Sequence, residues 1–247
     1  MNDALLEVSS LRKSYGDKVV LRDIDLSVSA HDVICLIGSS GSGKSTLLRC
    51  LNLLEEIDDG VIEFDGREIS DPRVDRREVR SRMGMVFQSY NLFPHLTVLE
   101  NCALAPRRVH GVPKAEAEQR AHDLLTRFGL ADQAAKHPDR MSGGQQQRAA
   151  LVRALCTQPT LLLLDEITAA LDPELVGDVL TIVRDLAEQG TTMILATHEM
   201  AFARDVATQV CFLDQGRILE QGAPAEIFSQ PREERTRQFL ARVLPAG

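Results

Sequence analysis

The stretch that decides the fold reads VICLIGSSGSGKSTLL and spans residues 33–48. Its first five residues form a continuous apolar run, which is typical of a strand buried on both faces of a sheet. The glycine-rich segment that follows, closed by Lys44 and Ser45, matches the phosphate-loop pattern. Residues 46–54 continue as a predicted helix, so backbone amides at a helix N-terminus can bind phosphate. This context favours a nucleotide site over a chance glycine-rich turn. Lys44 is then expected to contact the β- and γ-phosphates, and the Ser45 hydroxyl to ligate magnesium.

Three more apolar runs extend this unit towards the C-terminus. They cover residues 161–164, 191–196 and 210–213, and the clearest helical pattern between them covers residues 173–189. Strands that alternate with helices predict a mostly parallel sheet with helices on both faces. The tail from Ala223 predicts two short helices broken at Pro231.

The remaining segments differ from this α/β pattern. Residues 5–9, 19–28 and 61–64 alternate or carry β-branched residues between turn signals, which predicts antiparallel strands. Residues 88–155 contain three prolines, an amphipathic stretch at 114–128 and no convincing strand. We therefore predict one domain, residues 1–247. Its α/β core and antiparallel β subdomain come from residues 1–87 and 156–247, and a helical subdomain is inserted at 88–155.

Composition limits the classes of function. The chain has 247 residues, 44% of them hydrophobic, and a net charge of −8. This charge argues against a general nucleic-acid binder, although a local basic patch would be compatible with it. We expect a soluble protein, since no apolar run approaches the roughly 18 residues of a membrane span and the N-terminus lacks a secretory signal. The five cysteines are scattered without a CxxC pair, which favours reduced structural thiols in the cytosol over a metal or redox site.

Two further motifs carry chemistry. Residues 161–166 read LLLLDE, a strand that ends in Asp165 and Glu166. On its own this is usually a solvated strand end, but paired with a phosphate loop it resembles a Walker B strand, which implies a magnesium ligand and a general base. Residues 142–146 read SGGQQ and begin a predicted helix, for which Ser142 is a good N-cap. A cap with a flexible glycine pair is the simpler interpretation of this second motif.

Together these motifs resemble the ATPase subunits of ABC (ATP-binding cassette) transporters. The resemblance implies a P-loop NTPase (RecA-like) core, an N-terminal antiparallel β subdomain and an inserted helical subdomain. It also implies ATP and Mg²⁺ as ligands. In this family the Ser-Gly-Gly-Gln segment of one subunit closes over ATP held by another, so the resemblance implies a head-to-tail homodimer with ATP between the subunits.

The resemblance also implies roles for individual residues. The catalytic set is Glu166, His198, Lys44 and Gln88, and the magnesium set is Ser45, Gln88 and Asp165. The ATP-binding set is Tyr15, Ser39, Ser40, Gly41, Ser42, Gly43, Lys44, Ser45, Thr46, Ser142, Gly143, Gly144, Gln145 and Asp172. Three members have ordinary alternatives: Gln88 as a surface residue, His198 as a polar strand cap and Tyr15 as a core tyrosine.

The sequence departs from the family pattern at three positions. Met141 replaces the usual leucine, a change that nearly conserves volume. Ile167 stands where proline is common, and Ala169 where serine is common. None of the three removes a nucleotide-binding group, but Ile167 and Ala169 lie in loops that connect the sites, so they bear on coupling.

Within the family, the resemblance is closest to ATPases of polar amino acid uptake. It is carried by residues 92–106, 172–176 and 197–203. It implies a peripheral protein on the cytoplasmic face of the membrane, bound to permease subunits and indirectly to a solute-binding protein. Tyr90, Leu92 and Phe93 would line the groove for the permease, or else belong to the subdomain core. A soluble ATPase without a transport role and a transporter ATPase for another solute are the alternatives.

Overall fold

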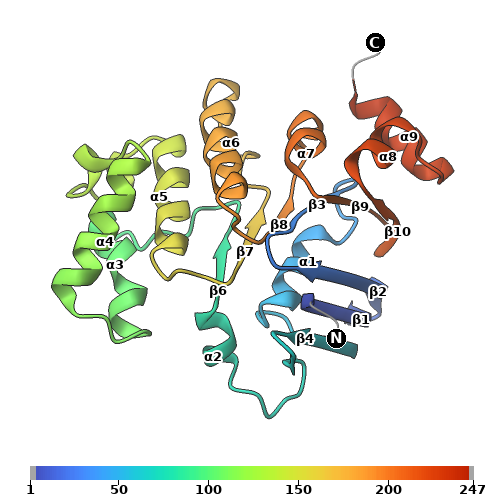
Figure 1. Ribbon diagram of the computed structural model, residues 1–247, viewed down its shortest axis with the longest axis horizontal. Coiled ribbons are helices and arrows are strands. Elements are labelled where there is room, and N and C mark those ends of the chain that lie inside the picture. The colour runs from blue at the N-terminus through green and yellow to red at the C-terminus, as the bar shows by residue number, and fades with distance from the viewer. Residues whose placement is uncertain (1–3, 245–247) are drawn as a thin grey trace.

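The computed structural model describes residues 4–244 and contains two sheets (Figure 1). The larger sheet has the strand order β10-β9-β3-β8-β7-β6. All of its neighbouring strands are parallel except the edge strand β10, which pairs antiparallel with β9. The bounds are β3 Val33–Ile37, β6 Met83–Val86, β7 Leu161–Asp165, β8 Met193–Ala196, β9 Gln209–Asp214 and β10 Arg217–Gly222. The predicted mostly parallel sheet is confirmed.

The register of this sheet positions the site. Leu36 of β3 lies opposite Ala196 of β8, and Val86 of β6 lies opposite Leu164 of β7. The carboxyl ends of these four parallel strands therefore meet at one edge. In open α/β sheets this edge is where ligands bind.

The two faces of the large sheet are covered differently. Residues such as Cys35, Leu162 and Phe212 pack with the later helices in one hydrophobic cluster. Their neighbours, such as Leu36 and Leu163, pack with α1 (Lys44–Leu51) and the antiparallel sheet in a second cluster. The prediction of helices on both faces was thus incomplete, because a sheet covers much of the second face.

The antiparallel sheet has the order β2-β1-β4-β5. Its bounds are β1 Ala4–Tyr15, β2 Lys18–Ser29, β4 Asp59–Phe64 and β5 Arg67–Glu68. Gly16 turns the chain between β1 and β2 with φ 57°, a left-handed conformation that glycine adopts at little cost. The predicted antiparallel strands are confirmed, and β1 and β2 are longer than predicted.

Helices occupy the region of residues 88–155 within the described chain. They are α3 Val98–Arg108, α4 Lys114–Arg127 and α5 Gly143–Leu155, with short 3-10 helices at Ala131–Gln133 and Pro138–Arg140. Figure 1 places α3 and α4 at one end of the molecule, with α5 between them and the sheet. Ser142 caps α5, as the sequence predicted, and the structure adds a capping box with Gln145.

The other helices are α2 Arg76–Ser81, α6 Pro173–Glu188, α7 Met200–Val206, α8 Pro224–Ser229 and α9 Glu234–Val243. The predictions of α6 and of the two tail helices are confirmed. Four short elements were not predicted from the sequence: α2, α7, β5 and β10. Each has at most seven residues and so shows too little of a repeating pattern.

Burial accounts for the cysteines. All five are buried and unbridged. Burial raises the pKa of Cys50 and of Cys211 to about 12, so both thiols stay protonated near neutral pH. Within residues 4–244, none of the helices has the length and apolar content needed to cross a membrane.

Candidate functional site

A cavity of about 620 Å³ opens at the carboxyl edge of the large sheet. Its walls come from the start of β2, the phosphate loop, the ends of β6 and β7 and the turn between β9 and β10. The lining residues are Lys18, Val19, Val20, Arg22, Ser40, Gly41, Gly43, Lys44, Ser45, Thr46, Gln88, Glu166, Gln215 and Gly216. The cavity thus brings together loop, strand-end and β2 residues that are far apart in the sequence.

The phosphate loop follows β3 directly and turns into α1. A Cβ atom on Gly38 would lie 2.1 Å from the Leu213 carbonyl oxygen, and one on Gly43 would lie 2.7 Å from Leu21 Cδ2. Only glycine fits at these two positions, both of which also have positive φ. Lys44 is buried, and its Nζ donates to the carbonyl oxygens of Gly38 at 3.1 Å and Ser39 at 3.3 Å.

The loop has the features of a phosphate site. Gly43, the N-cap of α1, makes no capping side-chain hydrogen bond, and the first turn of α1 has no acidic residue. The first-turn amides and the helix dipole are therefore available to an anion. The buried Ser42 hydroxyl has no hydrogen-bond partner among the described residues. These observations fit a bound phosphate.

Two oxygen ligands stand where magnesium is expected. Ser45 Oγ donates to Asp165 Oδ1 at 2.7 Å. Burial raises the pKa of Asp165, the Ser45 hydrogen bond lowers it and the charge of Glu166 raises it again. A hydroxyl and a carboxylate are ligands that suit Mg²⁺, whose bound charge would neutralise phosphate oxygens.

The buried carboxylate predicts a gain in stability from Asp165→Asn. The raised pKa means that the ionised form costs stability at neutral pH, whereas asparagine keeps an acceptor for Ser45 without a charge. Without magnesium or nucleotide, we expect the melting temperature to rise by about 2–4 °C. The difference from wild type should shrink as the pH falls and Asp165 takes up a proton. Scanning calorimetry across a pH series measures both effects, and a lower melting temperature at neutral pH would contradict the argument.

Glu166 lies between the ammonium group of Lys44 and the imidazole of His198. Its Oε1 is 3.4 Å from Lys44 Nζ and 3.1 Å from His198 Nε2. Its backbone has φ 46°, which is unusual for glutamate, and its amide donates to the Ala196 carbonyl at 3.0 Å. Strained conformations of this kind concentrate at functional sites because the surrounding structure maintains them. The structure thus places Glu166, Lys44 and His198 in one contact group.

Gln88 lines the cavity, whereas Tyr15 is not among its lining residues. Gln88 is exposed after β6. Tyr15 is 45% exposed, so the alternative of a core tyrosine is wrong. Lys13 Nζ lies 5.0 Å from the centre of its ring. Partial burial and the charge of Glu55 raise the pKa of Tyr15, and an interaction with the Thr46 hydroxyl of α1 lowers it.

This position predicts that Tyr15→Ala weakens ATP binding. Stacking of a base on an aromatic side chain contributes enough that its loss should raise the Kd for ATP about tenfold. Titration with a fluorescent ATP analogue measures this change. Tyr15→Phe is the control, because it keeps the ring and should bind within about twofold of wild type. Equal affinity of the alanine variant would rule out the stacking role.

The structure does not bring Ser142–Gln145 or Asp172 into the cavity. Ser142 is exposed, and its hydroxyl accepts from the Gln145 amide at 3.3 Å. A Cβ on Gly143 would lie 3.1 Å from the Tyr90 hydroxyl, so this helix start faces the Gln88 loop and not the phosphate loop. Asp172 is exposed at the N-cap of α6. One chain therefore presents the cavity and the Ser-Gly-Gly-Gln segment as separate surfaces.

Several lining residues were not predicted from the sequence. Lys18 and Arg22 reach the cavity from β2, and Gln215 and Gly216 from the turn between β9 and β10. The turn had a usable signal, since a glycine between two apolar segments indicates a hairpin. Lys18 and Arg22 carry no such sequence signal, because a charged residue on a strand is usually only a solvated side chain.

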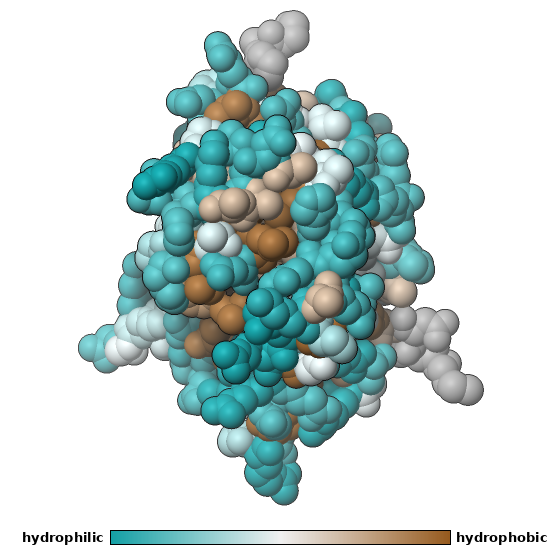
Figure 2. All heavy atoms as spheres, turned by 90° about the vertical axis from the view of Figure 1, so that its left-hand side faces the viewer, coloured by the Kyte–Doolittle hydropathy of each residue, from teal (hydrophilic) through white to brown (hydrophobic). Residues whose placement is uncertain are grey.

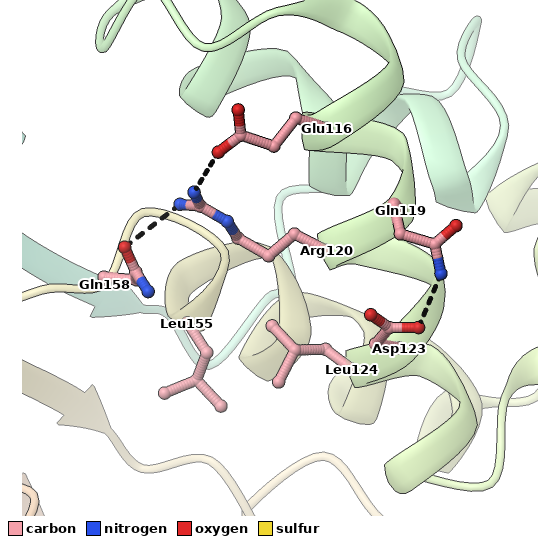
Figure 3. A pocket seen from close by; sticks show the side chains of 7 residues that line it. All are labelled: Glu116, Gln119, Arg120, Asp123, Leu124, Leu155 and Gln158. Carbon is pink, nitrogen blue, oxygen red and sulfur yellow. Dashed lines mark hydrogen bonds and ion pairs between the residues drawn. The ribbon is translucent and has the colours of Figure 1, made fainter.

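A second hollow, of about 450 Å³, lies on α4 and the end of α5 (Figure 3). Its polar side chains are paired with one another: Arg120 bonds Glu116 and Gln158, and Gln119 bonds Asp123. Leu124 and Leu155 provide apolar lining. This hollow contains none of the predicted site residues and lies away from the carboxyl edge of the sheet.

Comparison with known proteins identifies the family of the chain. A family model described as ABC transporter matches residues 21–169. The chain is 49% identical to the glutamine transport ATP-binding protein GlnQ of Geobacillus stearothermophilus, over 95% of this chain and 97% of that protein. It is 50% identical to the general L-amino acid transport ATP-binding protein AapP of Rhizobium johnstonii, over 98% and 94%.

A solved structure shares the fold. It is the dimeric post-hydrolysis state of the ATP-binding cassette MJ0796 bound to ADP and Pi, with a TM-score of 0.79 and 30% identity over 89% of this chain and 98% of that one. The matched family region contains the phosphate loop, the Ser-Gly-Gly-Gln segment and the Asp165–Glu166 pair. With a match of this extent, the chain belongs to the ABC transporter family and is one of its ATP-binding, ATP-hydrolysing subunits.

Proposed function

We propose that the chain powers the uptake of polar amino acids as the ATPase subunit of a membrane transporter. Support comes from relatives whose names refer to glutamine and general L-amino acid transport, each about half identical over nearly the whole chain. In this proposal the subunit binds permease subunits at the cytoplasmic face of the membrane. A solute-binding protein delivers the cargo to the permease.

Within each site we assign the following roles. Glu166 accepts a proton from the attacking water, Lys44 binds the β- and γ-phosphates, and His198 contacts the γ-phosphate. Ser45, Gln88 and Asp165 hold Mg²⁺. Tyr15 stacks on adenine, and the amides and hydroxyls of residues 39–46 bind phosphate. The observation that carries this assignment is the contact of Glu166 with both Lys44 and His198 at the edge of the cavity.

The second half of each site is proposed to come from another copy of the chain. Ser142, Gly143, Gly144 and Gln145 would contact the γ-phosphate across the interface, and Asp172 would cross it. The separation of this segment from the cavity within one chain supports the proposal. So does the dimeric state of the related cassette MJ0796. Two sites then form in a head-to-tail homodimer.

Residues 88–155 are proposed to move as one helical subdomain and to carry the permease-binding surface. Phe93 is 43% exposed, whereas Tyr90 and Leu92 pack partly against the hydrophobic core. Figure 2, which faces the helical end, shows apolar atoms gathered in a hollow among hydrophilic ones. Exposed apolar surface with a polar rim is typical of a protein–protein contact.

The direct test is ATPase activity after reconstitution with the permease and with binding proteins loaded with different amino acids. We expect one loaded binding protein to stimulate hydrolysis. Phe93→Asp should reduce this stimulation at least about tenfold, because a charge in an apolar contact costs more than 1.4 kcal/mol. The basal rate of the isolated chain should stay unchanged. Val243→Asp, at an exposed apolar position on α9, is the matched control and should keep the stimulation.

The alternatives give different results in the same experiment. A soluble ATPase without a transport role would hydrolyse ATP but respond to no membrane partner. An ATPase for another solute would respond to its permease but to no amino-acid binding protein. Either result would replace the amino acid assignment and leave the ATPase assignment intact.

A further inference from the structure

The turn between β9 and β10 forms one wall of the nucleotide cavity. It consists of Gln215 and Gly216, with φ of 49° and 81°, which is the two-residue hairpin with both central residues left-handed. A Cβ on Gly216 would lie 2.2 Å from the Val20 carbonyl oxygen, so the turn packs directly against β2. Its position therefore affects the shape of the cavity.

Backbone hydrogen bonds join this turn to the two other walls. The Gly216 amide donates to the Ser42 carbonyl of the phosphate loop at 3.1 Å, and the Arg22 amide of β2 donates to the Gly216 carbonyl at 2.8 Å. On the preceding strand, the Leu213 carbonyl lies against Gly38 at the start of the phosphate loop. A displacement of the turn would pull on both the loop and β2.

The turn is held from outside by the C-terminal helix α9. Arg235 Nε donates to Asp214 Oδ2 at 3.1 Å, and its Nη2 donates to Oδ1 at 3.2 Å. Asp214 is only 6% exposed and directly precedes the turn. Phe239 of α9 packs on Phe212 of β9, with ring centres 5.1 Å apart, and Figure 1 shows α9 beside this edge of the sheet. A two-bond arginine–carboxylate pair fixes orientation as well as distance.

We propose that Arg235 is a positioning residue for nucleotide binding: through Asp214 it holds the Gln215–Gly216 turn against the phosphate loop and β2. The inference rests on the nucleotide cavity proposed above and is independent of the cargo. It also gives the C-terminal helix a direct mechanical link to the ATP site, about 190 residues away from the phosphate loop in sequence.

The test is Arg235→Gln in the full chain. Without the guanidinium, the buried Asp214 carboxylate loses its cation and must move towards water, and the turn moves with it. We expect the Kd for a fluorescent ATP analogue and the KM for ATP to rise roughly fivefold, and kcat to change by less than about twofold. Arg235→Lys keeps the charge but loses the planar two-bond geometry, so it should restore part of the affinity.

Arg237→Gln is the matched control. Arg237 lies on the same helix and pairs with Glu234, but its hydrogen bonds stay within residues 231–237. Its Kd for the ATP analogue should equal that of wild type. The inference is overturned if Arg235→Gln binds ATP as wild type does, or if Arg237→Gln weakens binding equally. If wild type itself binds no ATP, the failure lies with the cavity assignment and not with Arg235.

Discussion

Glu166→Gln is expected to lower the rate of ATP hydrolysis by about 10²–10⁴ while ATP remains bound. The amide cannot accept a proton from water, but it keeps the size of the side chain and an oxygen that can face Lys44 and His198. If the two sites lie between two chains, the ATP that is not hydrolysed should hold the chains together. Size-exclusion chromatography with ATP and magnesium should then show a dimer that wild type forms only transiently.

Glu199→Gln is the control for a nearby carboxylate. Glu199 follows His198, and its Oε1 accepts from Thr168 Oγ1 at 3.3 Å, but it does not line the cavity. We expect this variant to retain hydrolysis within about tenfold of wild type, because glutamine keeps an oxygen that can accept from Thr168. Hydrolysis by Glu166→Gln at the wild-type rate would show that Glu166 is not the general base. An equal loss of activity in both variants would show that the effect is not specific to Glu166.

The sequence predicted those parts of the fold that local pattern determines. Few other structures are compatible with an apolar run at 33–37 followed by a glycine loop and a helix. The strand β3 has the predicted bounds. The second face of the large sheet was not predictable in this way. Its cover by the antiparallel sheet depends on the packing of distant segments into one cluster, which no local window contains. Members of this cluster include Leu6, Leu26, Leu36 and Leu163.

The site shows the same limit. Motifs predicted that Lys44, Ser45, Asp165 and Glu166 would follow strand ends, and the parallel register then brought them together. The positive φ of Glu166 and the contacts of Gly216 could not be predicted from the sequence, because both depend on tertiary packing. Lys18 and Arg22 on β2 were missed for a related reason: they line the cavity and do not belong to the core.

Ser142→Arg is expected to separate nucleotide binding from hydrolysis. Ser142 is exposed and lies outside the cavity, so the variant chain should bind a fluorescent ATP analogue within about twofold of wild type. In the proposed dimer, however, Ser142 faces the nucleotide of the partner, where an arginine side chain would keep the chains apart. Because a clash across an interface costs several kcal/mol, hydrolysis should fall at least roughly a hundredfold.

Loss of the helix cap is the competing explanation, and the chain contains a matched control for it. Thr97 caps α3 in a capping box with Glu100, just as Ser142 caps α5 with Gln145. Thr97→Arg removes a cap of the same kind, at a cost of about 1 kcal/mol, and should leave hydrolysis by the isolated chain near the wild-type rate.

Mixing Ser142→Arg with Lys44→Ala gives a second readout, since one site of each mixed dimer then has both halves intact. Activity should return to at most about a quarter of wild type, because half of the dimers are mixed and each has one complete site. The arginine of a mixed dimer faces the site from which Lys44→Ala has removed the nucleotide, so it has no nucleotide to clash with there. Normal hydrolysis by Ser142→Arg alone would mean that each chain works without its partner's segment.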